Sequence, residues 1–112
     1  MLYSKTITIP ANTLLSNPLK KQFIIREKVI TKIEVMIDII ATKSLVGVKL
    51  FGGKPDFRVF SFPVDSADWI RKSEVWIGRI ELLEVNLPVD IEGISPGAIK
   101  DHIVIISIHT EK

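Results

Sequence analysis

Alternation of apolar and polar side chains is the most regular feature of the chain, and it is clearest over residues 29–40. One parity of this segment is almost uniformly apolar and the other is mostly polar or mixed: Val29, Thr31, Ile33, Val35, Ile37 and Ile39 against Ile30, Lys32, Glu34, Met36, Asp38 and Ile40. A period of two residues predicts a half-buried β-strand. Because the segment is longer than most strands, we expect it to bend, bulge or end near Asp38.

Shorter segments, some alternating and some apolar throughout, predict the remaining strands. They are Leu2–Ile9, Phe23–Ile25, Val46–Leu50, Phe57–Phe62, Val75–Leu87, Pro88–Gly93 and His102–His109. Pro10 ends the first of them, because proline cannot donate a hydrogen bond to a neighbouring strand. The apolar phase of Val75–Leu87 switches near Leu82, which indicates a bulge or a break there. The longest irregular insert runs from Pro63 to Ser73.

The predicted fold is therefore all-β: an antiparallel β-sandwich or jelly roll of seven to eight strands. A chain of 112 residues has the length of one ordinary domain. We expect residues 1–112 to form this single domain, with residues 1–18 as an N-terminal arm. The composition agrees, because isoleucine occurs 19 times and β-branched side chains favour strands.

The absence of cysteine removes disulfides, zinc–thiolate sites and thiol nucleophiles from consideration. Isoleucine and lysine richness with no cysteine and two methionines is typical of thermophilic sources. The start of the chain lacks the basic and apolar segments of a signal peptide. The longest apolar runs, near residues 35–40 and 103–108, are far shorter than the roughly 20 residues of a membrane helix. We expect no membrane partner.

Charge is distributed unevenly along the chain. Residues 1–55 hold nine basic and three acidic residues, whereas residues 56–112 hold six basic and ten acidic residues. Either the two halves interleave in space and cancel, or a basic surface meets an acidic surface on a neighbouring copy. The basic residues lack the interleaved aromatic side chains of single-strand binders, so no nucleic-acid partner is predicted.

The two histidines do not form a metal site or a catalytic pair in the predicted fold. His102 and His109 lie seven residues apart on one strand and so point to opposite faces. We expect both to be surface residues near strand ends.

The acidic and glycine-rich segments do not match known catalytic spacings either. Asp65 and Asp68 are too few for calcium, and Glu81 and Glu84 fall on opposite faces of a strand. The sequence Gly-Gly-Lys at residues 52–54 lacks the spacing of a phosphate-binding loop, and we read it as part of a hairpin turn. The chain is therefore predicted to be no enzyme, with no catalytic residues, no metal and no cofactor.

Aromatic side chains are the better candidates for function. The predicted interface residues are Trp69, Ile70, Arg71 and Asp68 in the insert, together with Trp76 and Tyr3. Trp69 and Ile70 either fold back to plug one end of the sandwich or anchor another subunit, since tryptophan and arginine are favoured at interface centres. Trp69, Trp76 and Tyr3 are also the candidates for stacking on a sugar.

Three stretches taken in order carry a family resemblance: KTITIPANTLLSNPLKKQFII at the start, VGVKLFGGK followed by FPVDSADWIRKSE in the middle, and KDHIVIISI near the end. Together they resemble small β-sandwich proteins encoded by tailed bacteriophages and by archaeal viruses or proviruses. The resemblance implies a non-enzymatic virion protein, a capsid decoration or vertex component that forms homo-oligomers and binds a capsid protein. A carbohydrate- or ligand-binding β-sandwich module is the alternative.

Overall fold

Eight strands make up the fold in a computed structural model that describes residues 1–38, 46–54, 57–62, 69–70, 73–82 and 87–111. They are β1 (Leu2–Ile9), β2 (Leu19–Ile25), β3 (Val29–Ile37), β4 (Gly47–Lys54), β5 (Phe57–Phe62), β6 (Glu74–Glu81), β7 (Leu87–Ile94) and β8 (His102–Glu111). The described residues contain no helix. The predicted all-β class is confirmed.

The strands form two antiparallel sheets of four strands each. Sheet A has the order β1-β8-β3-β6 and sheet B has the order β2-β7-β4-β5. Within these sheets β1 pairs with β8, β2 with β7, β3 with β6 and β4 with β5. The chain is thus paired as one long hairpin, with its first strand against its last, and that hairpin is rolled into two layers.

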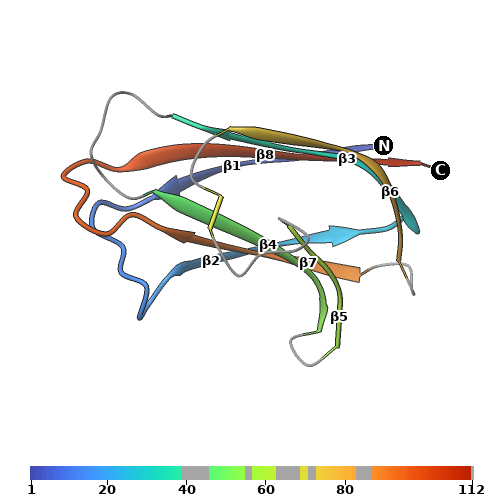
Figure 1. Ribbon diagram of the computed structural model, residues 1–112, viewed down its shortest axis with the longest axis horizontal. Helices are drawn as coiled ribbons and strands as arrows, with labels where there is room; N and C mark the ends of the chain where they lie inside the picture. The colour runs from blue at the N-terminus through green and yellow to red at the C-terminus, as the bar shows by residue number, and fades with distance from the viewer. Residues whose placement is uncertain (39–45, 55–56, 63–68, 71–72, 83–86, 112) are drawn as a thin grey trace.

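This arrangement is a jelly roll, the eight-stranded double-sheet architecture. Every connection except the one between β4 and β5 leads from one sheet to the other. Figure 1 shows the two layers, with both chain termini at the same end of the sandwich. The connections after β1 and after β7 lie together at the opposite end, which we call the distal end.

The core lies between the sheets and is built almost entirely from aliphatic side chains. Sheet A contributes Ile33, Val35, Val104, Ile106 and Ile108, and sheet B contributes Ile25, Val48, Leu50, Val89 and Ile91. These positions alternate with exposed or half-buried ones along each strand, as expected for a strand with one face on the core. With no disulfide present, burial of this aliphatic surface is the main stabilising term.

The alternation predicted for β3 is correct at one end of the strand only. Ile33, Val35 and Ile37 face the core as expected, but Ile30 is buried there in place of Val29 and Thr31. The pairing of β3 with both neighbours shifts register between Ile30 and Lys32. In a bulge, two consecutive residues of one strand lie opposite a single residue of the neighbouring strand. Side chains on one side of the bulge therefore point to the opposite faces from those that strict alternation predicts.

Several strand limits also differ from the prediction. β2 begins at Leu19 and not at Phe23, and β4 runs through Gly52 and Gly53 to Lys54 with a register shift between the two glycines. These glycines therefore belong to a bulged strand and not to the hairpin turn. The predicted breaks near Asp38 and Leu82 are confirmed, since β3 ends at Ile37 and β6 at Glu81.

The N-terminal segment is part of the sandwich. Leu2–Ile9 pairs along its whole length with β8 of the same chain. Residues 10–18 form the connection to β2 at the distal end. The first half of the predicted arm is therefore an intramolecular strand, because its alternating side chains cover the core beside β8.

Truncating a core side chain tests this packing. Ile106 is 0% exposed in the middle of β8, and we expect Ile106→Ala to lower the free energy of unfolding by about 2–5 kcal/mol through lost burial and the cavity left behind. Urea unfolding followed by circular dichroism measures the difference. Ile99→Ala is the matched control, because Ile99 is 91% exposed. Equal losses in the two variants would contradict the core assignment.

Candidate interaction surface

The predicted anchor residue Ile70 lies in the chain's own core. Its side chain is 2% exposed, and its backbone pairs with Val48 through hydrogen bonds of 2.9 Å and 2.8 Å. Residues 69–70 thus lie beside the start of β4 and pair with it through one isolated antiparallel bridge. Ile70 has no surface to offer another subunit, and its burial fits the alternative in which the insert folds back onto the sandwich. Asp68 and Arg71 lie outside the described residues.

Trp69 covers the outer side of sheet B. Its side chain lies so close to Gly47 that a Cβ atom at that position would come within 2.7 Å of the Trp69 Cβ. The Lys49 ammonium group lies 4.5 Å from the centre of the indole ring, within the range of a cation–π interaction. The half-buried Trp69 is therefore held by β4 on one side and by a lysine over its ring.

Trp76 and Tyr3, the other two aromatic candidates, are both half-buried and packed against the core. Trp76 faces inward from β6 and its ring lies beside Gly78, where an added Cβ would come within 2.5 Å of Cζ2. Tyr3 directs its hydroxyl group toward the turn between β2 and β3. Both rings therefore contribute to this chain's own packing.

A polar cluster around Glu27 fastens that turn to the ends of β1 and β8. Tyr3 Oη donates to the Glu27 carboxylate at 3.0 Å and accepts from the backbone N–H of Arg26 at 3.1 Å. Thr110 Oγ1 also donates to Glu27. These hydrogen bonds, that from Thr110 first, hold the pKa of Glu27 below its ordinary value. The carboxylate therefore joins three segments that are distant in sequence.

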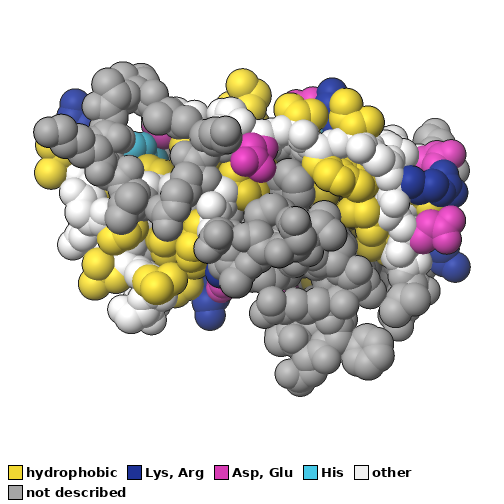
Figure 2. All heavy atoms as spheres, in the orientation of Figure 1, with side chains coloured by type: hydrophobic (Ala, Val, Ile, Leu, Met, Phe, Trp, Pro, Cys, Tyr) yellow, Lys and Arg dark blue, Asp and Glu magenta, His cyan; other side chains and the backbone are white. Residues whose placement is uncertain are grey.

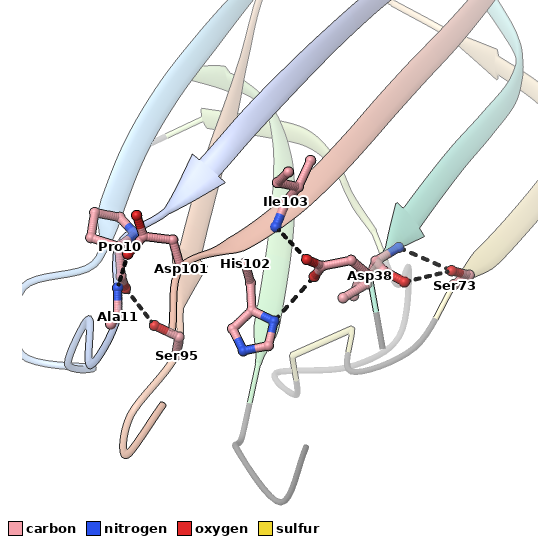
Figure 3. Close-up of polar contacts among 9 residues, drawn as sticks. Pro10, Ala11, Asp38, Ser73, Ser95, Asp101, His102 and Ile103 are labelled. Carbon is pink, nitrogen blue, oxygen red and sulfur yellow. Dashed lines mark hydrogen bonds and ion pairs between the residues drawn. The ribbon is translucent and has the colours of Figure 1, made fainter. Parts of the chain in front are cut away.

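His102 is buried, contrary to the surface position predicted for it. It is 4% exposed at the start of β8, and its Nδ1 lies 3.1 Å from Asp38 Oδ1. Asp38 Oδ2 also accepts from the backbone N–H of Ile103 at 2.9 Å, and Figure 3 shows the carboxylate between these two partners. Asp38 thus contacts the His102 ring and the backbone N–H of Ile103 together, and it ties the end of β3 to the start of β8. His109 lies half-exposed on the other face of β8, as its parity predicts.

The Asp38–His102 pair resembles two members of a hydrolase triad, but among the described residues the nearby Ser73 and Ser95 hydroxyl groups bond to backbone groups elsewhere. Ser73 Oγ is engaged with the backbone of Ile37. Ser95 is 0% exposed, and its hydroxyl donates to the Pro10 carbonyl at 2.7 Å. In the described part of the chain no three His, Asp or Glu side chains are grouped to hold a metal ion.

Hydrogen bonds between two connections close the distal end. The N–H of Ala11 donates to Asp101 at 2.8 Å, and the N–H of Gly97 donates to the Asn12 side chain at 2.9 Å. Asn12 and Gly97 both have positive φ angles, of 56° and 79°. Such angles suit glycine and asparagine. Figure 3 shows two of the contacts that tie the connection after β1 to the one after β7, Ala11 with Asp101 and Ser95 with Pro10.

The outer face of sheet A is a candidate interaction surface that the aromatic residues did not indicate. Large apolar side chains are exposed there on three adjacent strands: Met36 on β3, Val75 and Ile77 on β6, and Ile103 and Ile105 on β8. Val75 and Ile77 are 60% and 74% exposed. Figure 2 shows hydrophobic side chains along the upper edge of the molecule, where this sheet lies. Some of these side chains had a signal in the sequence: Met36, for example, is an apolar residue on the mostly polar side of the predicted strand 29–40.

Register places these side chains in one patch, which we call the outer patch. Ile105 lies directly opposite Met36, and Val75 lies opposite Glu34, two residues from Met36. Ser107, Thr6 and Ser4 fill the neighbouring positions toward β1. On β3 the ion-paired Lys32 and Glu34 lie opposite Ile77 and Val75. An apolar patch with a polar border is typical of a protein–protein contact.

Comparison with known proteins identifies no relative: no model of a protein family matches the chain, and no curated protein matches it significantly. Among the described residues no helix is long and apolar enough to cross a membrane.

Glu27 makes stability depend on pH in a defined direction. Because folding lowers its pKa, the ionised carboxylate stabilises the fold above the ordinary glutamate pKa of about 4.3, and this contribution is lost as the pH falls through the lowered value. We expect Glu27→Gln to melt at a lower temperature than the wild type at neutral pH. The difference should shrink in acid. Thermal unfolding across the acidic range measures it.

Glu92→Gln serves as the control for Glu27→Gln, because Glu92 is a half-buried glutamate on the outer side of β7, outside this cluster. It should show no comparable change with pH. A melting difference for Glu27→Gln that stays constant into strong acid would contradict the role given to its charge.

Proposed function

We propose that this chain is a non-enzymatic structural component of a virus particle, a homo-oligomeric decoration or vertex protein associated with the capsid. The observation that carries the proposal is the outer patch on a jelly-roll sandwich. Jelly rolls form viral capsid domains as well as lectins and cupins, so the fold is compatible with the role without deciding it. The sequence resemblance to small viral β-sandwich proteins points the same way.

The exposed apolar side chains of the outer patch favour an assembly protein over a protein that acts alone. Monomeric soluble proteins rarely keep contiguous apolar patches exposed, since such surface is a liability for aggregation. Met36, Val75 and Ile77 are each more than half exposed, and they lie beside the exposed Ile103 and Ile105 on one sheet face. A subunit that packs on a larger lattice would cover them.

The alternative, a carbohydrate-binding module, has less support. Sugar binding on a sandwich commonly uses an accessible aromatic ring, and the Lys49 ammonium lies over the ring of Trp69. Trp76 is directed toward the core, and the hydroxyl of Tyr3 is engaged by Glu27. A sugar would therefore have to displace Lys49 to stack on Trp69.

Association with virus particles tests the proposal. Particles purified from cultures of the source on a density gradient should contain the chain in a fixed ratio to the major capsid protein, measured by mass spectrometry and by immunogold labelling. Labelled recombinant protein added to the particles should sediment with them and saturate. A chain that stays in the soluble fraction and does not bind the shells would contradict the proposal.

A glycan array with the same recombinant protein tests the alternative function, carbohydrate binding. Under the proposed function we expect no saturable binding to any glycan. Saturable binding that Trp69→Ala abolishes would replace the virion role with the carbohydrate-binding one.

A further inference from the structure

We infer that the outer face of sheet A is the surface through which two copies of this chain pair, face on face. The inference rests on the proposed function, which requires a homo-oligomer, and it adds the surface and the occupant. Four of the six interface residues predicted from the sequence lie in the insert near Trp69, and Trp76 and Tyr3 lie on sheet A. The exposed apolar side chains of sheet A point outward, away from the inward Trp76 and Tyr3.

The apolar half of this face is continuous across three strands. Ile105 and Met36 face each other across β8 and β3, and Ile103 follows two residues along β8. Val75 extends the patch to β6, at the edge of the sheet. Sheet faces with alternating apolar side chains pack on one another at about 10 Å separation. The outer patch has the composition that such packing requires.

Charged side chains on the same face are already paired within the chain. Lys32 Nζ lies 2.6 Å from Glu34 Oε1, and this contact lowers the pKa of Glu34. Arg79 lies 2.6 Å from Glu111 and 3.4 Å from Glu81, and Glu111 raises the pKa of Arg79. When a partner covers these side chains, each charge keeps its ion-pair partner, so no uncompensated charge is buried.

This pairing favours a second copy as the occupant. Near a two-fold axis each side chain meets its own counterpart, so a face with unpaired charge of one sign would repel itself. On the described part of sheet A each outward charged side chain has an opposite charge beside it. Nothing on this face selects a partner of strong opposite charge, and its apolar patch can pack against itself.

The outer face of sheet B has a different character and serves as an internal comparison. Lys20, Glu92 and Lys49 follow one another across β2, β7 and β4, and Gln22 donates to Asp90 on the adjacent row. Lysine, glutamate and aspartate are depleted at interface centres. Ile24 is an exposed apolar side chain on the same face, and the charged rows beside it are the described part of sheet B that we expect to remain in water.

The size of the face corresponds to a small interface, near the lower limit for specific contacts. Four strands about 4.8 Å apart and eight residues long at about 3.3 Å per residue cover a footprint of about 500 Å². The rough molecular surface over that footprint is larger than its plane. A standard interface buries about 800 Å² per partner, roughly a tenth of a small protein's surface, and this chain exposes 6781 Å². Pairing along the edge of β6 alone would bury much less.

Cysteine cross-linking locates the contact. The chain contains no cysteine, so Met36→Cys and Ile105→Cys each introduce a single thiol on an inner strand of sheet A. We expect a short bis-maleimide to link at least one of these variants into covalent dimers. Lys20→Cys, exposed on the outer face of sheet B, is the matched control and should remain monomeric on the gel.

Light scattering on a size-exclusion column measures the pairing itself. We expect the wild type to form dimers, or multiples of two, as concentration rises. Ile77→Lys combined with Ile105→Lys should weaken self-association at least about tenfold, because four lysines would meet in one interface. Circular dichroism must show both proteins folded, and Lys20→Glu is the charge-change control on sheet B.

Three results would overturn the inference. They are a wild type that stays monomeric at high concentration, a double variant that is folded and associates as strongly as the wild type, and cross-linking through Lys20→Cys but not through the sheet A positions. These solution results are separate from particle binding. A monomer that still sediments with capsids overturns the pairing alone, and a dimer that never binds particles overturns the virion role alone.

Discussion

The pairing of the last strand with the first and third strands is the constraint on which this fold depends. β8 lies inside sheet A, with β1 on one side and β3 on the other. Its inward side chains Val104, Ile106 and Ile108 are completely buried. Sheet A is therefore complete only when the final ten-residue strand is in place. The nested pairs of β1 with β8, β2 with β7 and β3 with β6 are all distant in sequence, so the chain must lose much entropy before these contacts stabilise it.

Polar side chains hold the two ends of the sandwich, where strands cross from one sheet to the other. At one end Glu27 joins the β2–β3 turn to Tyr3 and Thr110. Near the distal end Asp38 satisfies His102 and the backbone of Ile103. In both places a carboxylate accepts donors from segments more than twenty residues away. The aliphatic core stabilises the layers without directional preference, and these contacts give the strand ends defined partners.

The two outer faces explain how such a fold can serve assembly. The described outward side chains of sheet B are lysines, acids, a lysine-covered tryptophan and the exposed Ile24, whereas sheet A carries exposed isoleucine, valine and methionine beside paired charges. Among the described residues, sheet A thus has the larger apolar patch and is the face better suited to contact. That division underlies the proposed role as a virion component, because a subunit of a lattice needs one surface for its neighbours and another for solvent.

The sequence by itself determined where most strands lie and where they break. A period-two pattern located β1 at its observed limits, the aromatic-rich segment after the turn residues located β5, and the end of β3 and the break after β6 followed from length and phase. Local side-chain alternation carries this information, because a strand at a sheet surface exposes every second residue. The all-β class and the sandwich follow from it.

Only the tertiary structure decided the strand order, the burial of Ile70 and His102, and which face of sheet A is exposed. The first half of β8 is apolar on both parities, so only the polar Ser107, His109 and Glu111 farther along the strand indicated that Ile103 and Ile105 face outward. The bulge beside Ile30 likewise exchanged faces that alternation had assigned. The reason is physical: backbone hydrogen bonds between strands are alike whatever the side chains, so pairing and burial depend on segments far apart in the chain.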